Sequence, residues 1–508
     1  MARRDAVRIA TRVTTGIVGV AVLGVVVTGA LLLPPPAVDA SAPSVLVTPV
    51  ATDQQRVCPG ALLRPPAADA ASTTTAVAVG SAAVTTGSAT TGSTGTAPAV
   101  RTSRIQAPEV QGAASSAPSV LAAAGAVDDA PTDLAGAASE IATQADLAGL
   151  AAASCSEATA DAWLVGGATT TGRTTFVVLD NPSGVSSTVD LAITGEGGAV
   201  SAPGASGISV PAGARRVLSL AGLAPDLSSP AVHVQSRGGQ VVARLEQSTV
   251  RGLLAGGVDW IGPAASPATA LTMTGLRIDS QAAPVAPVAP VDGQDAAADD
   301  EGGSAPGTGS DAGPEPDRTT AVRILAPGTE DADVSVSVTP EEGTDGTGTT
   351  FTVQVDAGRT VDVPVADLTD GRYSVTVQSS VPVTAAVRSV SGAAESGATD
   401  FAWLPSAEAL TRDALVSVPA GPAPLLHLRN AGDQPAAVTA RPTDGSAAVS
   451  LDVPAGSEVS AAVEGGRTYL LEGATGLTAT VTLAEPGRSA ALPVVPVLPA
   501  ADPLRVHP

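Results

Sequence analysis

The chain has 508 residues, which is enough for three or four domains of ordinary size. It carries 49 acidic residues against 26 basic ones, and the resulting net charge of −23 argues against a nucleic acid as partner. No lysine occurs in the sequence, so a P-loop phosphate site and Schiff-base chemistry are excluded.

The composition favours strands over helices. Apolar residues make up 44% of the chain but aromatic residues only 2%, and short alternating runs of Val and Thr are separated by Gly and Pro. Val and Thr suit a pleated surface, whereas Gly and Pro mark turns. The sequence therefore predicts an all-β protein.

The N-terminus predicts a membrane anchor. Four arginines, the last of them Arg12, precede an uncharged apolar run from Val13 to Leu33. As a helix this run would cross about 30 Å of hydrocarbon, and the arginines would keep the N-terminus inside the cell. We expect a single-pass protein of the cell membrane with its bulk extracellular. The alternative is a secreted protein, cleaved near Ala40.

The segment from Pro65 to Asp129 is rich in Ala, Thr, Ser and Gly. It offers few bulky side chains to bury, so we expect much of it to be flexible. A weak strand is expected at Thr75–Val79.

From Trp163 onward one unit of sequence occurs three times. Each copy is expected to begin near a tryptophan, at Trp163, Trp260 and Trp403. A strand then runs into a turn, where the two asparagines of the chain, Asn181 and Asn430, are found. Equivalent tryptophans predict a shared core or packing position.

Further along, each copy has a second turn, which ends in Gly213, Gly358 or Gly456. The segment ending in Tyr373 resembles the tyrosine corner of Ig-like sandwiches, and Tyr469 stands in a similar place in the third copy. A spacing of about 100 residues also suits that fold. The sequence thus predicts tandem Ig-like β-sandwich domains behind a single N-terminal transmembrane helix.

An acidic insertion lengthens the second copy. Residues 281–317 hold eight carboxylates and no arginine, so they are expected to be disordered. The strand-like run Leu271–Leu276 before them matches Ala414–Val418 of the third copy. On this alignment the insertion lies in a loop within the second domain.

These patterns predict six segments. They are an Arg-rich start and signal-anchor (1–40), an N-terminal β-segment with the low-complexity stretch (41–157), sandwich 1 (158–258), sandwich 2 with the insertion (259–399), sandwich 3 (400–500) and a tail (501–508).

No residue pattern points to catalysis, a cofactor or a metal. The histidines are His233 and His427, in alternating strands, and His507 in the tail. They lack metal-ligand spacing, and neither an H-E-x-x-H nor a G-x-S-x-G motif occurs. Acidic runs such as Glu330–Asp333 lack a calcium-loop pattern. We expect both strand histidines to have structural or surface roles.

Cys58 and Cys155, the two cysteines, both follow the predicted anchor. A disulfide is favoured outside the cell, and no other thiol competes. We predict a bond between them; the alternative is two free thiols or pairing between chains.

Several of these signatures together resemble an uncharacterised domain-of-unknown-function family of large exported, membrane-anchored actinobacterial proteins. The resemblance is carried by Cys58-Pro59-Gly60, Trp163–Gly167, Asn181-Pro182 and Val210–Gly213, and it covers most of the chain past the anchor. It implies an exported protein and transfers no functional residue.

Two functions stay open at this point. The first is a non-catalytic structural or adaptor protein of the cell envelope, which contacts the membrane through its helix and other envelope proteins or cell-wall glycans through its domains. The second is an envelope glycan-binding module or hydrolase, which would need exposed aromatic side chains or paired carboxylates in a cleft.

Overall fold

The structure is a computed structural model that describes residues 45–47, 53–67, 74–90, 97–113, 116–127, 130–279, 318–393, 397–495 and 504–506. The chain divides into two compact units, Ala51–Ala500 and a smaller one that joins Met1–Val50 to Ala501–Pro508. In the smaller unit β1 (Val45–Val47) pairs antiparallel with β36 (Leu504–Val506). The predicted anchor at 13–33 lies outside the described residues, and no helix within them is long and apolar enough to cross a membrane.

The described chain is all-β, as predicted. Its one described helix is the four-residue α2 (Leu220–Leu223). The larger unit consists of four modules in chain order, which we call the N-terminal module and modules 1, 2 and 3. Apolar side chains alternate along most strands and meet inside each module, which is why a Val- and Ala-rich sequence forms these cores.

The N-terminal module contains three small sheets, with orders β11-β10-β5, β2-β8-β6 and β3-β4-β7. Its strands are β2 (Gln54–Cys58), β3 (Leu62–Arg64), β4 (Ala76–Val79), β5 (Ala83–Thr90), β6 (Arg101–Arg104), β7 (Val110–Gln111), β8 (Ser119–Ala123), β9 (Ala126–Val127), β10 (Ala130–Gln144) and β11 (Leu147–Ser154). The strand expected at Thr75–Val79 is present as β4, but β5 to β8 correct the expectation that much of 65–129 is flexible.

Modules 1 and 3 share one strand order. In each, the first, sixth, third and fourth strands form one sheet, and the fifth, second, seventh and eighth form the other. Module 1 comprises β12 (Asp161–Val165), β13 (Arg173–Asp180), β14 (Ser187–Gly195), β15 (Gly198–Ala199) with β16 (Ile208–Val210), β17 (Arg215–Ser219), β18 (Ala231–Arg237), β19 (Val242–Arg251) and β20 (Leu254–Ile261). Module 3 comprises β28 (Ala414–Val418), β29 (Leu425–Asn430), β30 (Ala436–Pro442), β31 (Val449–Val453), β32 (Glu458–Ala462), β33 (Arg467–Glu472), β34 (Leu477–Glu485) and β35 (Arg488–Pro493).

Module 2 follows the same order with one long strand in place of two. The first part of β26 pairs with β21 and β23, and its last part pairs with β22 and β27. The strands are β21 (Ala268–Ile278), β22 (Ala321–Leu325), β23 (Ala332–Pro340), β24 (Thr349–Val355), β25 (Thr360–Pro364), β26 (Gly371–Gly392) and β27 (Thr399–Pro405). The acidic segment 281–317 lies outside the described residues, between β21 and β22, which both pair with β26. It therefore connects two strands of module 2.

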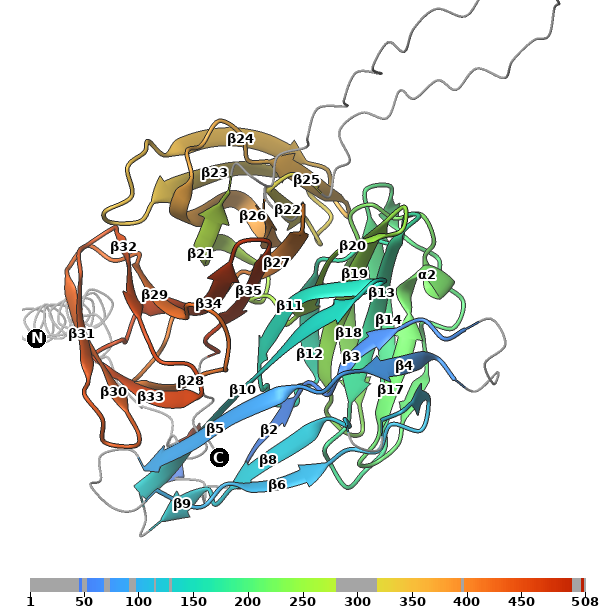
Figure 1. Cartoon of the computed structure of the whole chain (residues 1–508), viewed down its shortest axis with the longest axis horizontal. Coiled ribbons are helices and arrows are strands. Elements are labelled where there is room, and N and C mark those ends of the chain that lie inside the picture. Colours follow the sequence, from blue (N-terminus) through green and yellow to red (C-terminus); the bar gives the residue numbers. More distant parts are fainter. Residues whose placement is uncertain are drawn as a thin grey trace, which may run out of the picture. The chain divides into compact units, whose positions relative to one another are not determined.

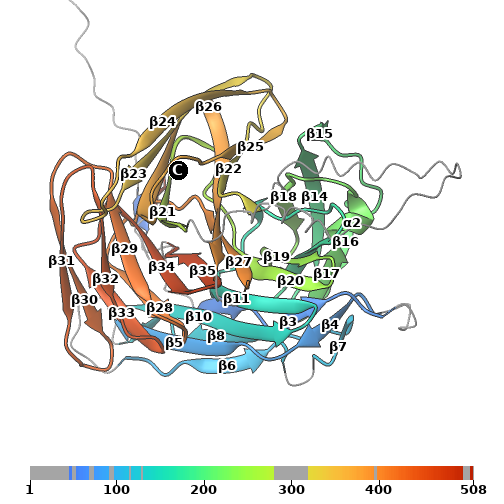
Figure 2. The same ribbon diagram turned by 45° about the horizontal axis from the view of Figure 1, so that its top comes forward.

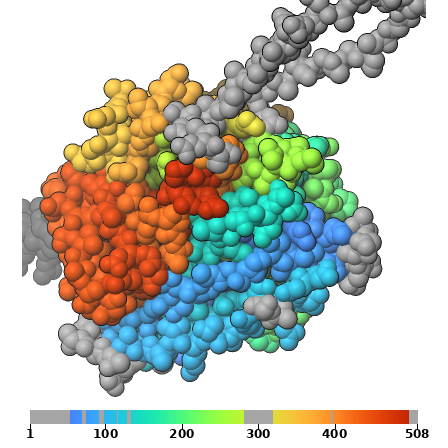
Figure 3. Space-filling view, viewed as in Figure 1, coloured from blue at the N-terminus to red at the C-terminus, as the bar shows by residue number. Residues whose placement is uncertain are grey.

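The last strand of each module lies at the centre of the larger unit (Figures 1 and 2). β11 packs on β20, β20 on β27, β27 on β35, and β35 on β11, which closes a circuit through all four modules. We call these four the central strands. Figure 3 shows the modules adjoining one another on one face. The predicted tandem domains are thus packed against one another in one compact unit, Ala51–Ala500.

One aspartate ties the central strands together. Asp400, on β27, accepts backbone hydrogen bonds from Leu150 on β11 at 2.8 Å, Val258 on β20 at 3.1 Å and Ser489 on β35 at 3.2 Å. Gly149, next to Leu150, has no room for a side chain, because an added Cβ would lie 2.6 Å from the Asp400 carboxylate. Close approach of the strands therefore requires glycine at this position.

The predicted turns recur in the three copies. Gly213, Gly358 and Gly456 all have left-handed φ angles, of 64°, 67° and 68°, which glycine adopts at low cost. The buried Asn181 bonds the carbonyls of Val185 and Val210, and Asn430 likewise bonds those of Gln434 and Val453. Each asparagine thereby fastens its own turn to the glycine turn, which explains why the sequence repeats both.

The strand pairing corrects the predicted alignment of the three repeats at one tryptophan. Trp260 and Trp403 lie on the last strands of modules 1 and 2, where they pair with β19 and β26. Trp163 lies on β12, the first strand of module 1, and is not their equivalent. Trp260 and Trp403 therefore close modules 1 and 2, whereas Trp163 lies on the strand that opens module 1. The predicted boundaries at 258/259 and 399/400 accordingly fall inside β20 and β27.

The predicted disulfide is confirmed. Cys58 and Cys155 are bonded, with their Cα atoms 4.1 Å apart, and both side chains are buried. The bond joins the end of β2 to the segment after β11, so it closes the N-terminal module.

Candidate functional site

The two equivalent tryptophans are buried between modules. The Trp260 indole donates to Glu246 at 3.0 Å, and the Trp403 indole donates to Gln247 at 2.7 Å. The guanidinium of Arg323 lies 4.8 Å from the centroid of the Trp403 ring, within the range of a cation–π contact. Both tryptophans therefore pack between modules.

The tyrosine corner also forms. The Tyr373 hydroxyl donates to the backbone oxygen of Thr369 at 2.9 Å, and the Tyr469 hydroxyl accepts the backbone N–H of Glu464 at 2.8 Å. Each hydroxyl fastens a loop to its own module.

One position on the second strand of each module faces a neighbouring module. Val178, Arg323 and His427 each stand three residues before a turn residue, namely Asn181, Ala326 and Asn430. The three turn residues make the same backbone bond, to Ala214, Arg359 and Ser457 respectively. This position thus carries an apolar side chain in module 1, a permanent cation in module 2 and a titratable side chain in module 3. We call these the joint positions.

Arg323 fills the joint between modules 1 and 2. It is fully buried and donates to the backbone oxygens of Gly167, Ser228 and Pro230 in module 1. Its guanidinium also makes a two-pronged pair with Asp362, at 2.7 and 2.9 Å. The planar guanidinium has five N–H donors, so it can bond several carbonyl oxygens and a carboxylate at the same time.

His427 fills the joint between modules 2 and 3 and is the centre of a buried polar cluster. Its Nδ1 lies 3.1 Å from Glu341 Oε2 of module 2 and 3.2 Å from Glu458 Oε1 of module 3. Its Nε2 lies 2.9 Å from the Thr482 hydroxyl. The three residues Glu341, His427 and Glu458 are all buried, and we call them the histidine centre.

The electrostatics of the histidine centre follow from burial and pairing. Burial alone would lower the pKa of His427, but the hydrogen bonds and charges of Glu341 and Glu458 outweigh it and raise the pKa above its ordinary value. Burial raises the pKa of Glu458 despite the opposing effect of His427. Burial also opposes ionisation of Glu341, yet its contacts with His427 hold its pKa below the ordinary value.

A cleft of about 420 Å³ opens beside the histidine centre. Residues of both modules line it, among them Gly275, Arg277 and Arg372 from module 2, and His427 and Thr482 from module 3. Apolar walls with a few convergent polar groups and perturbed pKa values are typical of a binding site. This joint cleft is the first candidate site.

A second cleft, of about 220 Å³, lies where the central strands end. The segments that follow β11, β20 and β27 and the end of β35 all line it, and β12 adds Asp161 and Trp163. We call it the axial cleft. Trp163 is half-buried, and one face of its indole stacks on His233 with the rings 3.8 Å apart. His233 in turn lies 2.8 Å from Asp161.

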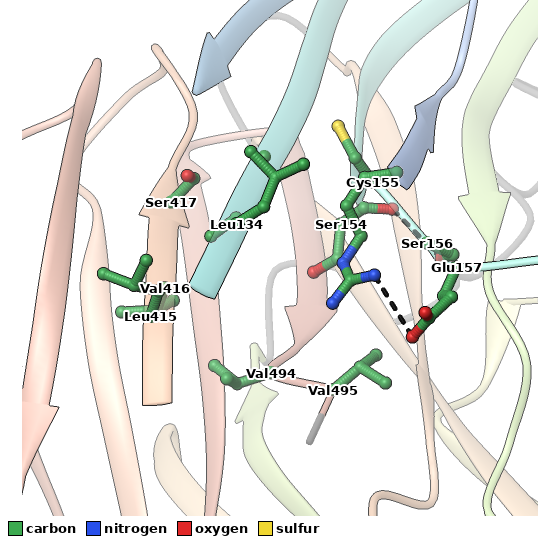
Figure 4. A pocket seen from close by; sticks show the side chains of 13 residues that line it. Leu134, Ser154, Cys155, Ser156, Glu157, Leu415, Val416, Ser417, Val494 and Val495 are labelled. Atoms are coloured by element: carbon green, nitrogen blue, oxygen red, sulfur yellow. Dashed lines mark hydrogen bonds and ion pairs between the residues drawn. The ribbon is translucent and has the colours of Figure 1, made fainter. Parts of the chain in front are cut away.

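A smaller pocket of about 40 Å³ adjoins the axial cleft (Figure 4). The two share Ser156, Glu157, Val494 and Val495. Glu157 pairs there with Arg56 at 3.1 Å, so its charge is partly compensated. The volume suits one or two water molecules rather than a larger ligand.

The sequence predicts a strand around His427 but does not indicate its buried partners Glu341 and Glu458. Glu341 lies 86 residues before it and Glu458 lies 31 residues after it, so no local spacing connects the three. A usable signal was the repeat itself, because His427 is equivalent to an apolar Val178 in module 1. A polar residue at a buried repeat position indicates a specific partner.

Comparison with known proteins gives a family and no further relative. No curated protein and no solved structure matches the chain significantly. Residues 109–464 match the model of a family of unknown function, DUF5719, which spans most of modules 1 to 3 and part of the N-terminal module. The chain therefore belongs to the DUF5719 family.

Proposed function

We propose that the protein is a non-catalytic, exported protein of the cell envelope with a structural or adaptor role. The observation that carries the proposal is the contact of Asp400 with the central strands of the three other modules. It makes the four modules one body with large outer sheet faces, which suits a rigid platform better than a flexible spacer. Each of modules 1 to 3 is proposed to be an Ig-like sandwich.

The buried carboxylates favour a structural role over catalysis. Glu246 accepts a backbone hydrogen bond from Leu63, and Asp259 accepts one from Trp403 at 2.7 Å. These groups hold neighbouring strands and do not line either cleft. A catalytic acid or base needs access to a substrate, which such positions do not give.

Export and anchoring rest on the apolar run at 13–33, which follows Arg12. The proposed location is the cell membrane with the bulk outside, and the alternative is secretion after cleavage near Ala40. Protease treatment of intact cells should digest the modules of the native protein. Mass spectrometry of the mature N-terminus should still find residues 1–40. Full protection of the modules would contradict export, and a start near Ala40 would favour the secreted form.

The adaptor role requires partners, proposed to be other envelope proteins or cell-wall glycans. Proximity labelling from the full chain in intact cells should enrich the same few envelope proteins repeatedly. Labelling of cytoplasmic proteins alone would contradict the proposal.

A second candidate function is glycan binding at the axial cleft. It is favoured by one half-buried indole, Trp163, beside the carboxylates Asp161, Glu157 and Glu408 and the buried Ser406 hydroxyl, which has no hydrogen-bond partner in the described structure. An aromatic face with convergent acceptors and donors suits a sugar ring. Trp163→Ala should then abolish saturable binding to purified cell-wall polymer. Phe351→Ala, at another half-buried aromatic side chain, serves as the control. Equal binding by both variants would contradict a role for this cleft.

A further inference from the structure

We propose that the histidine centre is a binding site for one divalent transition-metal ion of the zinc type, held between modules 2 and 3. Glu341, His427 and Glu458 each offer one ligand atom, and these atoms lie within 4.8 Å of one another. Zinc bonds of about 2.1 Å in tetrahedral geometry place ligand atoms about 3.4 Å apart. The separations from His427 Nδ1 to the two carboxylate oxygens, 3.1 and 3.2 Å, are close to that spacing.

An unpaired oxygen gives independent support. Glu458 is only 1% exposed, yet its Oε2 has no hydrogen-bond partner in the described structure. A buried carboxylate oxygen without a partner costs free energy, and native proteins nearly always satisfy such atoms. A cation bound to both oxygens of the Glu458 carboxylate would satisfy Oε2, while Oε1 keeps the backbone N–H of Gly275 at 2.8 Å.

Each proposed ligand is oriented by a second group. The Thr482 hydroxyl lies 2.9 Å from Nε2 of His427, on the side away from the two carboxylates. The Ser460 hydroxyl donates to Glu341, and Gly275 donates to Glu458. Metal-binding histidines and carboxylates are regularly held in this way, which fixes the ring and leaves one nitrogen for the metal.

The neighbouring cleft supplies an entry path, since His427 and Thr482 both line it. One imidazole nitrogen and two carboxylate groups suit Zn²⁺ or a similar ion, whereas Ca²⁺ needs six to eight oxygen ligands. Two cations oppose a metal at this site. Arg429 is the cross-strand partner of Glu458 and interacts with it electrostatically, and Arg372 Nε lies 3.2 Å from Glu341 Oε2. The Arg372 side chain is 47% exposed, so water screens its repulsion.

The three joint positions differ in a way that gives a metal a structural role between modules 2 and 3. Arg323 supplies a permanent cation between modules 1 and 2, and Val178 supplies an apolar contact in module 1. Only the third joint position carries a side chain that binds either a proton or a metal. A metal would therefore fasten modules 2 and 3 by linking Glu341 of one to His427 and Glu458 of the other.

The test is calorimetric titration of the untagged full-length chain with Zn²⁺, after treatment with EDTA and dialysis. We expect saturable binding of one Zn²⁺ per chain and no comparable binding of Ca²⁺. Glu458→Gln and His427→Gln should each weaken Zn²⁺ binding at least about tenfold. His233→Gln is the matched control, because His233 also lies on a strand and beside a carboxylate, Asp161. This variant should bind Zn²⁺ like the natural chain.

Three outcomes would overturn the proposal. They are no saturable Zn²⁺ binding by the natural chain, equal binding by Glu458→Gln, or a loss confined to His233→Gln. Circular dichroism checks that each variant is folded. Should the two ligand variants not fold, Thr482→Val decides, because it keeps all three ligands and removes only the group that orients His427. It should weaken binding about tenfold, and an unchanged affinity would count against the site.

Discussion

At the scale of single residues, buried ionisable side chains join the modules by bonding the backbone of a neighbour. Arg323 reaches three carbonyl oxygens of module 1, and Asp400 receives N–H groups from three other strands. Glu246 of module 1 accepts the backbone N–H of Leu63 on β3, and Glu140 accepts that of Leu62 within the N-terminal module. Such contacts specify one arrangement, because any other leaves a buried polar group without a partner.

Removing Arg323 should therefore be costly. Arg323→Met leaves Asp362 and three carbonyl oxygens without their donor, and we expect a loss of about 3–5 kcal/mol in the free energy of unfolding. Arg359→Met breaks only an exposed pair with Asp356 at 3.7 Å and should cost less than about 1 kcal/mol. Urea denaturation of the two variants compares them. Similar losses would mean that Arg323 contributes no more than a surface charge.

The buried carboxylates also predict how stability depends on pH. Burial raises the pKa of Asp400 and of Glu246 to about 8 and that of Glu140 to about 7, well above the values of unfolded chains. Between pH 4 and 8 the folded chain holds more of these protons than the unfolded chain. Stability should accordingly be fully present near pH 4 and fall as the pH rises through 7 to 8.

The measurement is the melting temperature between pH 5 and pH 8.5. It should decrease across that interval, and Glu140→Gln should reduce the decrease because one titrating group is removed. A melting temperature that rises over the same interval would show that these carboxylates stay ionised in the folded chain.

At the scale of elements, strands and turns were predictable because their signals are local. The turns at Gly213, Gly358 and Gly456, the corner at Tyr373 and the strand β4 follow from neighbouring residues. The pairing of strands was not predictable in the same way. Trp163 was aligned with Trp260 because both follow an aspartate, whereas only strand pairing shows that one opens a module and the other closes it.

Two kinds of glycine should respond differently to substitution. Gly358 has a left-handed φ but open space around it, so Gly358→Ala should cost only about 1 kcal/mol. Gly149→Ala would push a Cβ to 2.6 Å from Asp400 and 2.9 Å from the backbone nitrogen of Val258. The central strands would have to separate, so we expect a loss of several times that size. Thermal melts of the two variants provide the test, and equal shifts would contradict the close contact of β11 with β20 and β27.

At the scale of the whole molecule, closure by the central strands and the histidine centre could not be read from the sequence. Both depend on residues brought together from distant modules, such as Leu150 with Asp400, or Glu341 with His427. The acidic segment, by contrast, is recognised from the sequence alone, because the composition changes abruptly at both ends of 281–317.

Deleting residues 281–317 should leave the larger unit folded. The deletion leaves residues 279, 280 and 318–320 between β21 and β22, close to the connection 419–424 that joins the equivalent strands β28 and β29. The same pairing with β26 can then form from a shorter loop. Circular dichroism and a thermal melt of the deletion variant should match those of the full chain. Loss of the cooperative transition would show that the segment supports the fold.

Closure of the four modules through the central strands is tested most directly by hydrogen–deuterium exchange of the natural chain and Asp400→Ala. Asp400 lies on β27, yet three of its hydrogen-bond donors lie on β11, β20 and β35. Removing the carboxylate should therefore accelerate exchange in all of these strands together, while the outer strands β24 and β31 keep their protection. Faster exchange confined to β27 and its partner β26 would contradict the closed arrangement.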